Sequence, residues 1–135
     1  MKLLLVVCVC VCFAHSLKLK QETIDKWTEM SHPHVENCVE KSGVDKALAD
    51  SVYTNLDYPD DQQFKCYMDC MAKKFGVLDS NNKFDQEKIS DSTAPLDRKI
   101  VDDCVKKAEQ SLNTCEVGYV FGTCIILSVA EQQNL

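Results

Sequence analysis

The chain has little basic charge, few prolines and no low-complexity tract. Its 135 residues contain 15 Lys and Arg against 21 Asp and Glu, which gives a formal net charge of −6. Because no block of basic residues is present, nucleic acids and anionic membrane surfaces are poor candidates for partners. No internal repeat is found, and the three prolines are scattered along the chain. These features indicate a small acidic globular protein that does not bind nucleic acid.

The motifs that mark the common enzyme classes are also missing. The sequence contains no G-x-S-x-G, no H-E-x-x-H and no phosphate-binding loop. His32 and His34 flank Pro33, but two further ligands that would complete a zinc site are not evident nearby. We therefore predict a protein that is not an enzyme and that carries neither a cofactor nor a metal ion.

Residues 1–16 have the pattern of a secretory signal peptide. A basic Lys2 is followed by an apolar run that ends at Ala14, and a small-x-small cleavage site ends at Ser16. The run is too short to span a bilayer, which needs about 20 apolar residues. We expect a secreted, extracellular chain of residues 17–135, which is the length of one domain and has a net charge of −7 once Lys2 is removed.

Cysteine is the most informative residue type in the expected secreted chain. Three of the nine cysteines fall in the predicted signal peptide, and six remain: Cys38, Cys66, Cys70, Cys104, Cys115 and Cys124. Their spacing is C-x27-C-x3-C-x33-C-x10-C-x8-C. An even number of cysteines in a small exported chain is typical of a disulfide framework. Three bridges would leave no thiol to act as a nucleophile.

Apolar residues recur with a helical period along nearly the whole chain, so we predict an all-α fold with six helices and no sheet. The predicted segments are residues 20–30 and 34–43 on either side of a break or kink at Pro33, then 44–56, 60–75, a short helix after residue 85, 95–112, and 117–130.

Local signals mark several helix ends. Asp60 and Asp61 are candidate N-caps, and Asp85 is a candidate N-cap for the short helix. Gly76 is placed to end the helix that contains two of the cysteines. Pro95 suits the first turn of the helix that follows.

The last predicted helix differs from the others because residues 117–130 contain no charged side chain. A helix that is apolar on all sides is buried, so this one is expected in the middle of the fold. Gly118 and Gly122 are four residues apart on one face of it. They would allow a neighbouring helix or a ligand to approach closely.

Helix geometry restricts how the cysteines pair. Cys66 and Cys70 are four residues apart on one helix, which places their Cβ atoms about 5–6 Å apart, beyond the ~3.5–4.5 Å that a disulfide accepts. Cys115 and Cys124 are nine residues apart and would face opposite sides, ~13 Å apart along the axis. Each of these cysteines therefore needs another partner, and several pairings remain open.

The cysteine spacing resembles that of the insect odorant-binding protein family. The C-x3-C and C-x8-C elements are its most specific parts, and the segment KCYMDCMAKKFGVLDSNNKF is similar to the stretch around that family's second and third cysteines. The resemblance implies the interlocked pairs Cys38–Cys70, Cys66–Cys115 and Cys104–Cys124. It also implies a carrier that encloses a small hydrophobic ligand such as an odorant or pheromone. A membrane odorant receptor and a second copy of the chain would be its further partners.

The disulfides are consistent with a hollow interior. A cavity of about 300 Å³ would cost on the order of 7 kcal/mol, and three bridges at about 2–4 kcal/mol each would offset it. The resemblance implies that residues after the third cysteine and around the sixth line the cavity. We expect an almost wholly apolar pocket, with these ligand-binding residues: Val52, Leu56, Met68, Met71, Phe75, Val77, Phe84, Ile89, Ile100, Ala108, Phe121 and Ile125.

Polar residues have more limited expected roles. Tyr119 and Thr123 would orient a ligand oxygen or cap backbone groups. Protonation of His32 and His34 would loosen a helix junction at acidic pH, and the tail after Cys124 would fold over the pocket mouth or close a wall. The alternative function is a secreted helical signalling protein with a solid core, which would present an exposed apolar patch.

Overall fold

The computed structural model describes residues 16–93 and 96–135. The predicted signal peptide, apart from Ser16, lies outside the described residues, and so does Pro95. The helices are α1 (Gln21–Ser42), α2 (Lys46–Asp50), α3 (Gln62–Lys74), α4 (Gln86–Thr93), α5 (Arg98–Glu109) and α6 (Glu116–Gln133). Within these described ranges no strand forms, and Leu78 and Phe84 make an isolated β-bridge. The predicted all-α fold with six helices is confirmed.

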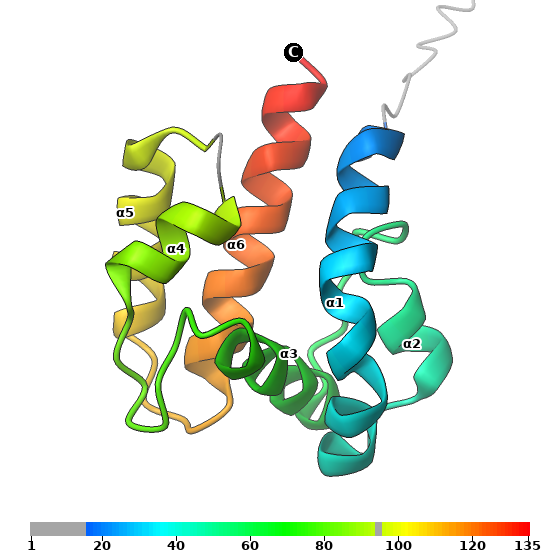
Figure 1. Ribbon diagram of the computed structural model, residues 1–135, viewed down its shortest axis with the longest axis vertical. Coiled ribbons are helices and arrows are strands. Elements are labelled where there is room, and N and C mark those ends of the chain that lie inside the picture. Colours follow the sequence, from blue (N-terminus) through cyan, green and yellow to red (C-terminus); the bar gives the residue numbers. More distant parts are fainter. Residues whose placement is uncertain (1–15, 94–95) are drawn as a thin grey trace, which may run out of the picture.

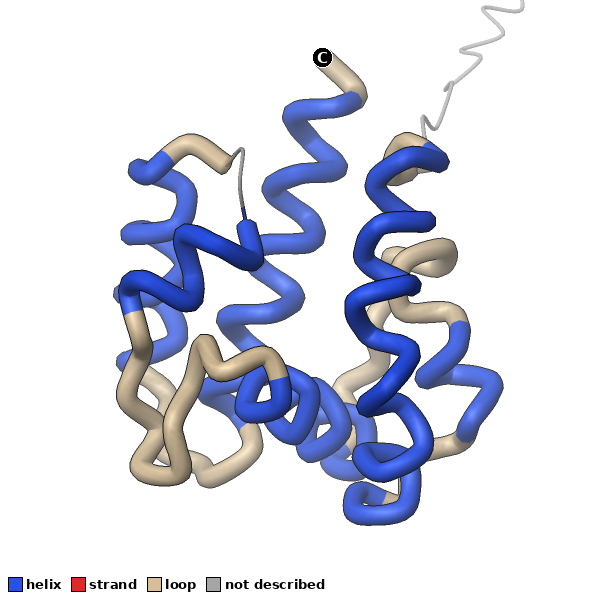
Figure 2. Tube along the Cα trace, viewed as in Figure 1, coloured by secondary structure: helices blue, strands red, loops and turns tan. Residues whose placement is uncertain are grey.

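Helix α6 runs through the middle of the molecule, as the absence of charged residues from 117 to 130 predicts (Figure 1). It packs against α3, which crosses near its N-terminal end, and against α5. The α1 and α2 helices lie on one side of α6, and α4 and α5 lie on the other (Figure 2). Helix α3 also packs against α1, so it joins the two sides.

The local signals for helix ends act as expected. The Asp61 carboxylate accepts a hydrogen bond from the Phe64 backbone N–H at 2.9 Å. The Asp85 carboxylate accepts from the N–H groups of Glu87 and Lys88 at 3.1 and 3.2 Å. Gly76 follows the end of α3 with φ +74°, a left-handed conformation that costs glycine little. These caps satisfy backbone groups that helix ends leave without partners.

Three predicted helix boundaries were wrong. Helix α1 continues through Pro33, so of the expected break or kink the break is absent. The helix predicted for residues 44–56 ends at Asp50 and continues as turns. Helix α5 begins at Arg98, where the Asp97 side chain accepts from the Lys99 N–H at 2.9 Å, and it ends before Leu112, which is fully exposed.

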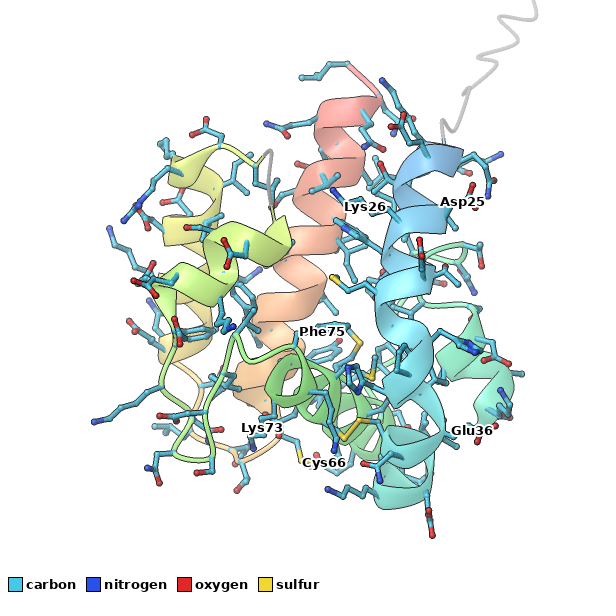
Figure 3. The ribbon with its side chains drawn as sticks, viewed as in Figure 1. Asp25, Lys26, Glu36, Cys66, Lys73 and Phe75 are labelled. Atoms are coloured by element: carbon cyan, nitrogen blue, oxygen red, sulfur yellow. A yellow bond between two sulfur atoms is a disulfide. The ribbon has the colours of Figure 1, made fainter. Side chains whose placement is uncertain are left out.

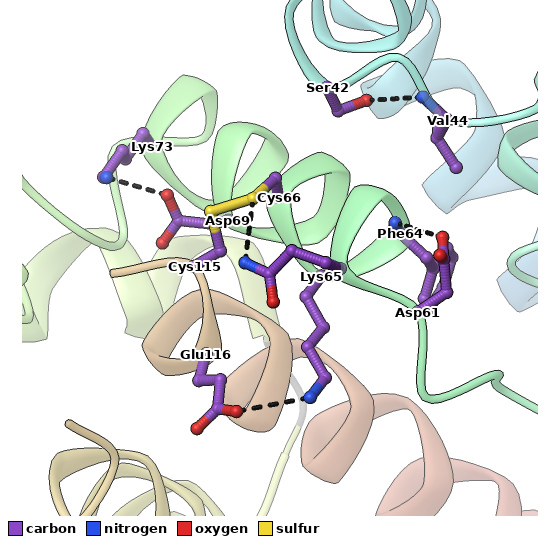
Figure 4. Close-up of a disulfide and its surroundings, with 11 residues drawn as sticks. Ser42, Val44, Asp61, Phe64, Lys65, Cys66, Asp69, Lys73, Cys115 and Glu116 are labelled. Carbon is purple, nitrogen blue, oxygen red and sulfur yellow. Dashed lines mark hydrogen bonds and ion pairs between the residues drawn. A yellow bond between two sulfur atoms is a disulfide. The ribbon is translucent and has the colours of Figure 1, made fainter. Parts of the chain in front are cut away.

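The three disulfides have the interlocked pairing that the resemblance implies. Cys38–Cys70 joins α1 to α3, and Cys104–Cys124 joins α5 to α6. Cys66–Cys115 joins α3 to the residue before α6 (Figure 4). Both pairs that helix geometry excluded, Cys66 with Cys70 and Cys115 with Cys124, are absent. The bridges therefore hold α3 against α1 on one side and α6 on the other.

Buried residues form two clusters. The first cluster lies among α1, α2, α3 and the second half of α6, and its buried members are Leu19, Cys38, Val44, Ala49, Val52, Phe64, Tyr67, Met68, Met71, Ile126, Val129 and Ala130. The second cluster lies among the end of α3, α4, α5 and the first half of α6, and its buried members are Ala72, Val77, Leu78, Ile89, Val101, Cys104, Val105, Ala108, Val117, Phe121 and Ile125.

Helices α3 and α6 approach each other closely at Gly118. A Cβ atom at Gly118 would lie 2.5 Å from the Cα of Asp69 and 2.9 Å from its Oδ1. Asp69 is 5% exposed, and its other carboxylate oxygen pairs with Lys73 Nζ at 2.7 Å (Figure 4). The predicted close approach of a neighbour to this face of α6 is therefore made by the backbone of α3.

Candidate ligand-binding site

A pocket of about 410 Å³ lies between α1, α2, α3 and α6. This volume is within the range of small-molecule sites, which runs from about 300 to 1,000 Å³. Most of its lining belongs to the first cluster, and residues at the border with the second cluster complete it. Helix α1 contributes one continuous wall, which includes Pro33.

The deepest part of the lining is apolar and comes from α3 and α6. Met68 and Met71 project from α3, and both are almost fully buried. Phe121 and Ile125 face the pocket from α6. Phe75 lies beyond the end of α3, close to α1 (Figure 3). These flexible thioethers and flat rings suit an irregular hydrocarbon ligand.

A second part of the lining carries hydroxyl groups. Ser31 Oγ on α1 and Tyr53 Oη lie 2.6 Å apart and share a hydrogen bond. The Tyr53 ring packs against the Trp27 ring with centroids 5.5 Å apart. Tyr67 on α3 also lines the pocket and is 3% exposed. The pocket is therefore amphipathic, and the prediction of an almost wholly apolar lining was wrong.

The environment keeps these phenols neutral. Burial raises the pKa of Tyr53, and the hydrogen bond with Ser31 lowers it in part. Burial also raises the pKa of Tyr67 well above its usual range, and the negative charges of ionised Tyr53 and of Asp50 raise it further. Both groups therefore remain hydroxyls over the whole physiological pH range.

Charged residues of α1 and α2 also line the pocket. Lys46 and Asp50 both line the pocket and form an ion pair at 3.1 Å, with more than half of each side chain exposed. Glu36 and His32 line the α1 side. An exposed pair of this kind contributes little to stability. The pair therefore affects the electrostatics of the pocket lining more than the stability of the fold.

Comparison with known proteins gives the family. The profile of the PBP/GOBP family matches residues 20–127, which is most of the chain. The chain belongs to this family.

Three relatives from Drosophila melanogaster support this membership. General odorant-binding protein 99a is 29% identical over 67% of this chain and 68% of its own length. General odorant-binding protein 99b is 30% identical over 67% of this chain and 66% of its own. General odorant-binding protein 57c is 31% identical over 56% and 52%. The chain thus spans between about half and two thirds of the length of these relatives.

A solved structure shows that the fold is shared as well. The crystal structure of odorant-binding protein 4 from the natural predator Chrysopa pallens superposes with a TM-score of 0.56 at 19% identity. The superposition covers 84% of this chain and 95% of that one. The odorant-binding protein family consists of non-enzymatic carriers of small hydrophobic ligands. Within the described part of the chain, no helix is long and apolar enough to cross a membrane.

The structure separates the residues predicted to bind ligand into two groups. Seven of them line the pocket: Val52, Met68, Met71, Phe75, Val77, Phe121 and Ile125. Five do not line it. Phe84, Ile89, Ile100 and Ala108 belong to the second cluster or pack against it, and Leu56 packs against the first cluster.

Several lining residues were missing from the prediction, above all Trp27, Ser31, Tyr53 and Tyr67. A signal for Ser31 was present in the sequence. Ser31 occupies a position on the buried stripe of α1 that runs through Trp27 and Cys38, where an apolar residue is expected. A small hydroxyl residue on an apolar stripe indicates a polar partner inside the fold.

Of the other polar residues singled out in the sequence, His32 lines the pocket, whereas Tyr119, Thr123 and His34 do not. Thr123 donates to the Tyr119 carbonyl at 2.8 Å, so it caps the backbone, and neither residue lines the pocket. His34 lies edge-on to Phe75 with ring centroids 6.0 Å apart. Since α1 is continuous, His32 and His34 do not flank a helix junction.

The C-terminal tail does not cover the pocket. It continues α6 as far as Gln133, whose side chain accepts from the Lys20 N–H at 2.7 Å and donates to Thr23 at 2.7 Å. Asn134 donates to the Lys18 carbonyl. The end of α6 is therefore fastened to the N-terminal end of α1, while Ile125 and Ile126 earlier in the helix form part of the pocket wall.

Proposed function

We propose that this chain is a secreted carrier that holds one small hydrophobic molecule in the pocket between α1, α2, α3 and α6 and transports it through extracellular fluid. The pocket itself carries the proposal. A space of about 410 Å³ lined by Met68, Met71, Phe121 and Ile125 has the size of a small-molecule site, and an apolar ligand there would gain dispersion contacts with these side chains. The Cys38–Cys70 bridge supports it, since it fixes two of the pocket's walls.

The alternative is a signalling protein that binds its partner through an exposed apolar patch. Among the described residues, the large hydrophobic side chains that are exposed are Leu112 and Leu135, which lie on different segments. Two isolated leucines do not form a patch of the size that marks a protein-binding surface. The amount of exposed apolar surface therefore favours the carrier.

Binding of the fluorescent probe N-phenyl-1-naphthylamine tests the proposal. We expect saturable uptake of one molecule per chain with micromolar affinity, roughly −8 kcal/mol. A Met71→Trp variant places a bulky ring inside the pocket and is expected to weaken uptake at least ten-fold. Leu112→Trp makes a similar change at an exposed position and serves as the matched control.

The results separate the two functions. No saturable uptake by the wild-type chain would support the signalling protein. Equal weakening by Met71→Trp and Leu112→Trp would place the probe outside the pocket, provided that circular dichroism shows both variants to be folded.

Secretion is tested separately. Expression of the full chain in insect cells is expected to release a protein into the medium whose first residue is near Leu17. Retention of Lys2 in the released protein would contradict removal of residues 1–16. A membrane odorant receptor and a second copy of the chain remain predicted partners.

A further inference from the structure

We propose that the pocket selects neutral ligands that carry one oxygen able to accept a hydrogen bond, and that the hydroxyl of Tyr67 anchors this oxygen. The ligand class would be medium-chain alcohols, aldehydes, ketones and esters, in preference to hydrocarbons and carboxylic acids. This inference rests on the proposed function and specifies the ligand of the same pocket.

The hydroxyl of Tyr67 has no hydrogen-bond partner within the described residues, although the side chain is only 3% exposed. The hydroxyl oxygen of Tyr67 is also not fully enclosed by protein. In the described ranges, the fully enclosed side-chain atoms that lack a partner are Asp69 Oδ1 and Asn82 Oδ1, and the Tyr67 oxygen is not one of them. Because Tyr67 lines the pocket, the remaining accessible surface of this hydroxyl faces the pocket space. A hydroxyl with an accessible face and no protein partner is free to bond to a molecule in the pocket, and a ligand oxygen would accept its hydrogen bond in place of water.

Ser31 and Tyr53 provide a second hydroxyl site on the same pocket. Two hydroxyls that share one hydrogen bond leave one O–H and several lone pairs unused. Ser31 is 4% exposed, and both residues line the pocket. A ligand alcohol that accepts from Tyr67 could donate its own proton to this pair.

The charges around these hydroxyls favour a neutral ligand. The negative charge of Asp50 acts on Tyr67, so it would also act on a ligand group bound to that hydroxyl. The nearby Lys46 is already paired with Asp50 at 3.1 Å, and Glu36 adds a further negative charge to the lining. The carboxylate of an acidic ligand would be repelled by these negative charges. Since Lys46 is already paired, no unpaired lysine or arginine lines the described pocket to offset the repulsion.

The apolar remainder of the pocket suits a hydrocarbon tail. Met68 and Met71 lie on the same helix as Tyr67, one and four residues further along. A ligand anchored at Tyr67 would therefore extend along α3 toward Phe75 and across to Phe121. These apolar side chains would select the length and shape of the hydrocarbon tail. The hydroxyls of Tyr67, Ser31 and Tyr53 would select the polar end of the ligand.

A Tyr67→Phe variant tests the anchor, because it removes the hydroxyl and keeps the ring. Displacement of N-phenyl-1-naphthylamine is measured with nonanol and with decane, which have the same number of heavy atoms. We expect the affinity ratio of nonanol to decane to fall about ten-fold in Tyr67→Phe. The ratio is taken within each variant, so a change in probe affinity cancels.

Tyr58→Phe is the matched control. The Tyr58 hydroxyl donates to the Val52 carbonyl at 2.7 Å, and this residue does not line the pocket. Its removal is expected to leave the ratio unchanged. Ser31→Ala, which does not alter α3, is expected to lower the ratio about three-fold and decides the question if Tyr67→Phe fails to fold.

In the wild-type chain at pH 7, nonanoic acid is expected to bind at least ten-fold more weakly than nonanol.

The failure of this inference is distinct from the failure of the carrier function. An unchanged nonanol-to-decane ratio in the folded Tyr67→Phe and Ser31→Ala variants would overturn the inference, and binding of decane would leave the carrier intact. Tighter binding of nonanoic acid than of nonanol would overturn the preference for neutral ligands. Absence of binding by the probe and by both ligands would overturn the carrier function itself.

Discussion

The two clusters on either side of α6 are buried to a similar degree but are built differently. The first cluster contains large rings with polar groups, among them Tyr53 and Tyr67, and it encloses most of the pocket. The second cluster is filled mainly by aliphatic side chains such as Ile89 and Val105, and none of the side chains described in α4 or α5 lines the pocket. The fold therefore combines a hollow region and a packed region that share one central helix.

The difference lies in what holds the side chains in place. In the first cluster, hydrogen bonds fix the rings: Tyr53 bonds to Ser31 at 2.6 Å, and Tyr58 bonds to the Val52 carbonyl at 2.7 Å. In the second cluster, mainly aliphatic side chains are closely packed, and the Cys104–Cys124 disulfide links two of its helices. Hydrogen bonds can fix side chains in place beside a free space, whereas close packing leaves no free space. Burial by itself does not tell a pocket from a core.

Removal of single disulfides is expected to have the largest effect. The loops closed by Cys38–Cys70 and Cys104–Cys124 span 32 and 20 residues, so loss of either bridge by replacement with alanine pairs should cost about 3–4 kcal/mol. Because only the first bridge joins two pocket walls, probe binding should fall strongly in the Cys38/Cys70 variant alone. Urea denaturation and probe titration measure the two effects. Equal losses of probe binding in the Cys38/Cys70 and Cys104/Cys124 variants would show that both bridges support the pocket to the same extent.

Truncation of one side chain in each cluster tests the contrast in packing. Ile89→Ala is expected to cost about 3–4 kcal/mol, since it creates a new cavity. Met68→Ala should cost about 2 kcal/mol, since part of its surface already faces empty space. Met68→Ala should also accept bulkier ligands. A larger loss for Met68→Ala, measured by chemical denaturation, would mean that the pocket side is the better packed of the two.

The two glycines of α6 separate backbone contact from pocket contact. Gly118→Ala brings a Cβ within 2.5 Å of the Asp69 Cα and should cost about 2 kcal/mol, because α3 and α6 must move apart. At Gly122 the nearest atom is the flexible end of Met68, at 2.9 Å, so Gly122→Ala should be close to neutral. It should nevertheless weaken binding of bulky ligands. Thermal unfolding measures the stability of both variants. Equal losses of stability in Gly118→Ala and Gly122→Ala would contradict this distinction.

A smaller effect is expected for the ion pairs of Lys65, which connects α3 to α6. Its Nζ lies 2.6 Å from Asp60 and 3.2 Å from Glu116. The hydrogen bond from Lys65 lowers the pKa of Asp60, and hydrogen bonds from Asn113 and Lys65 lower the pKa of Glu116. Because both folded-state pKa values are lowered, this stabilisation is complete above the ordinary pKa values of 3.8 and 4.5 and is lost as the pH falls through the lowered ones.

Lys65→Met should therefore destabilise the protein slightly at pH 7, and the difference from wild type should shrink toward pH 3. Lys99→Met is the control, since Lys99 pairs only within α5, with Asp103 at 2.8 Å. Thermal unfolding across the pH range measures both. A deficit for Lys65→Met that is as large at pH 3 as at pH 7 would assign it to the packing of Lys65 over the Tyr119 ring, 5.5 Å from its centroid.

The sequence was sufficient where the signal is local. The caps at Asp61 and Asp85 and the left-handed Gly76 act within a few residues of their own position, so neighbouring residues identify them. The charge-free residues 117–130, which make up most of α6, predicted a central helix for the same reason. The cysteine spacing identified the family, and through it the disulfide pairs.

Only the tertiary structure decided which buried residues border the pocket. Met71 and Ile89 both lie on apolar stripes, yet one faces the pocket and the other lies in the packed cluster. Helix periodicity reports which side of a helix is buried, and the distance to the facing helix decides whether free space remains there. Packing also overrode the cost of Pro33 inside α1, because contacts along the whole helix outweigh one missing hydrogen bond. The hydroxyls of Ser31 and Tyr53, 22 residues apart, meet only once α1 is folded as one piece.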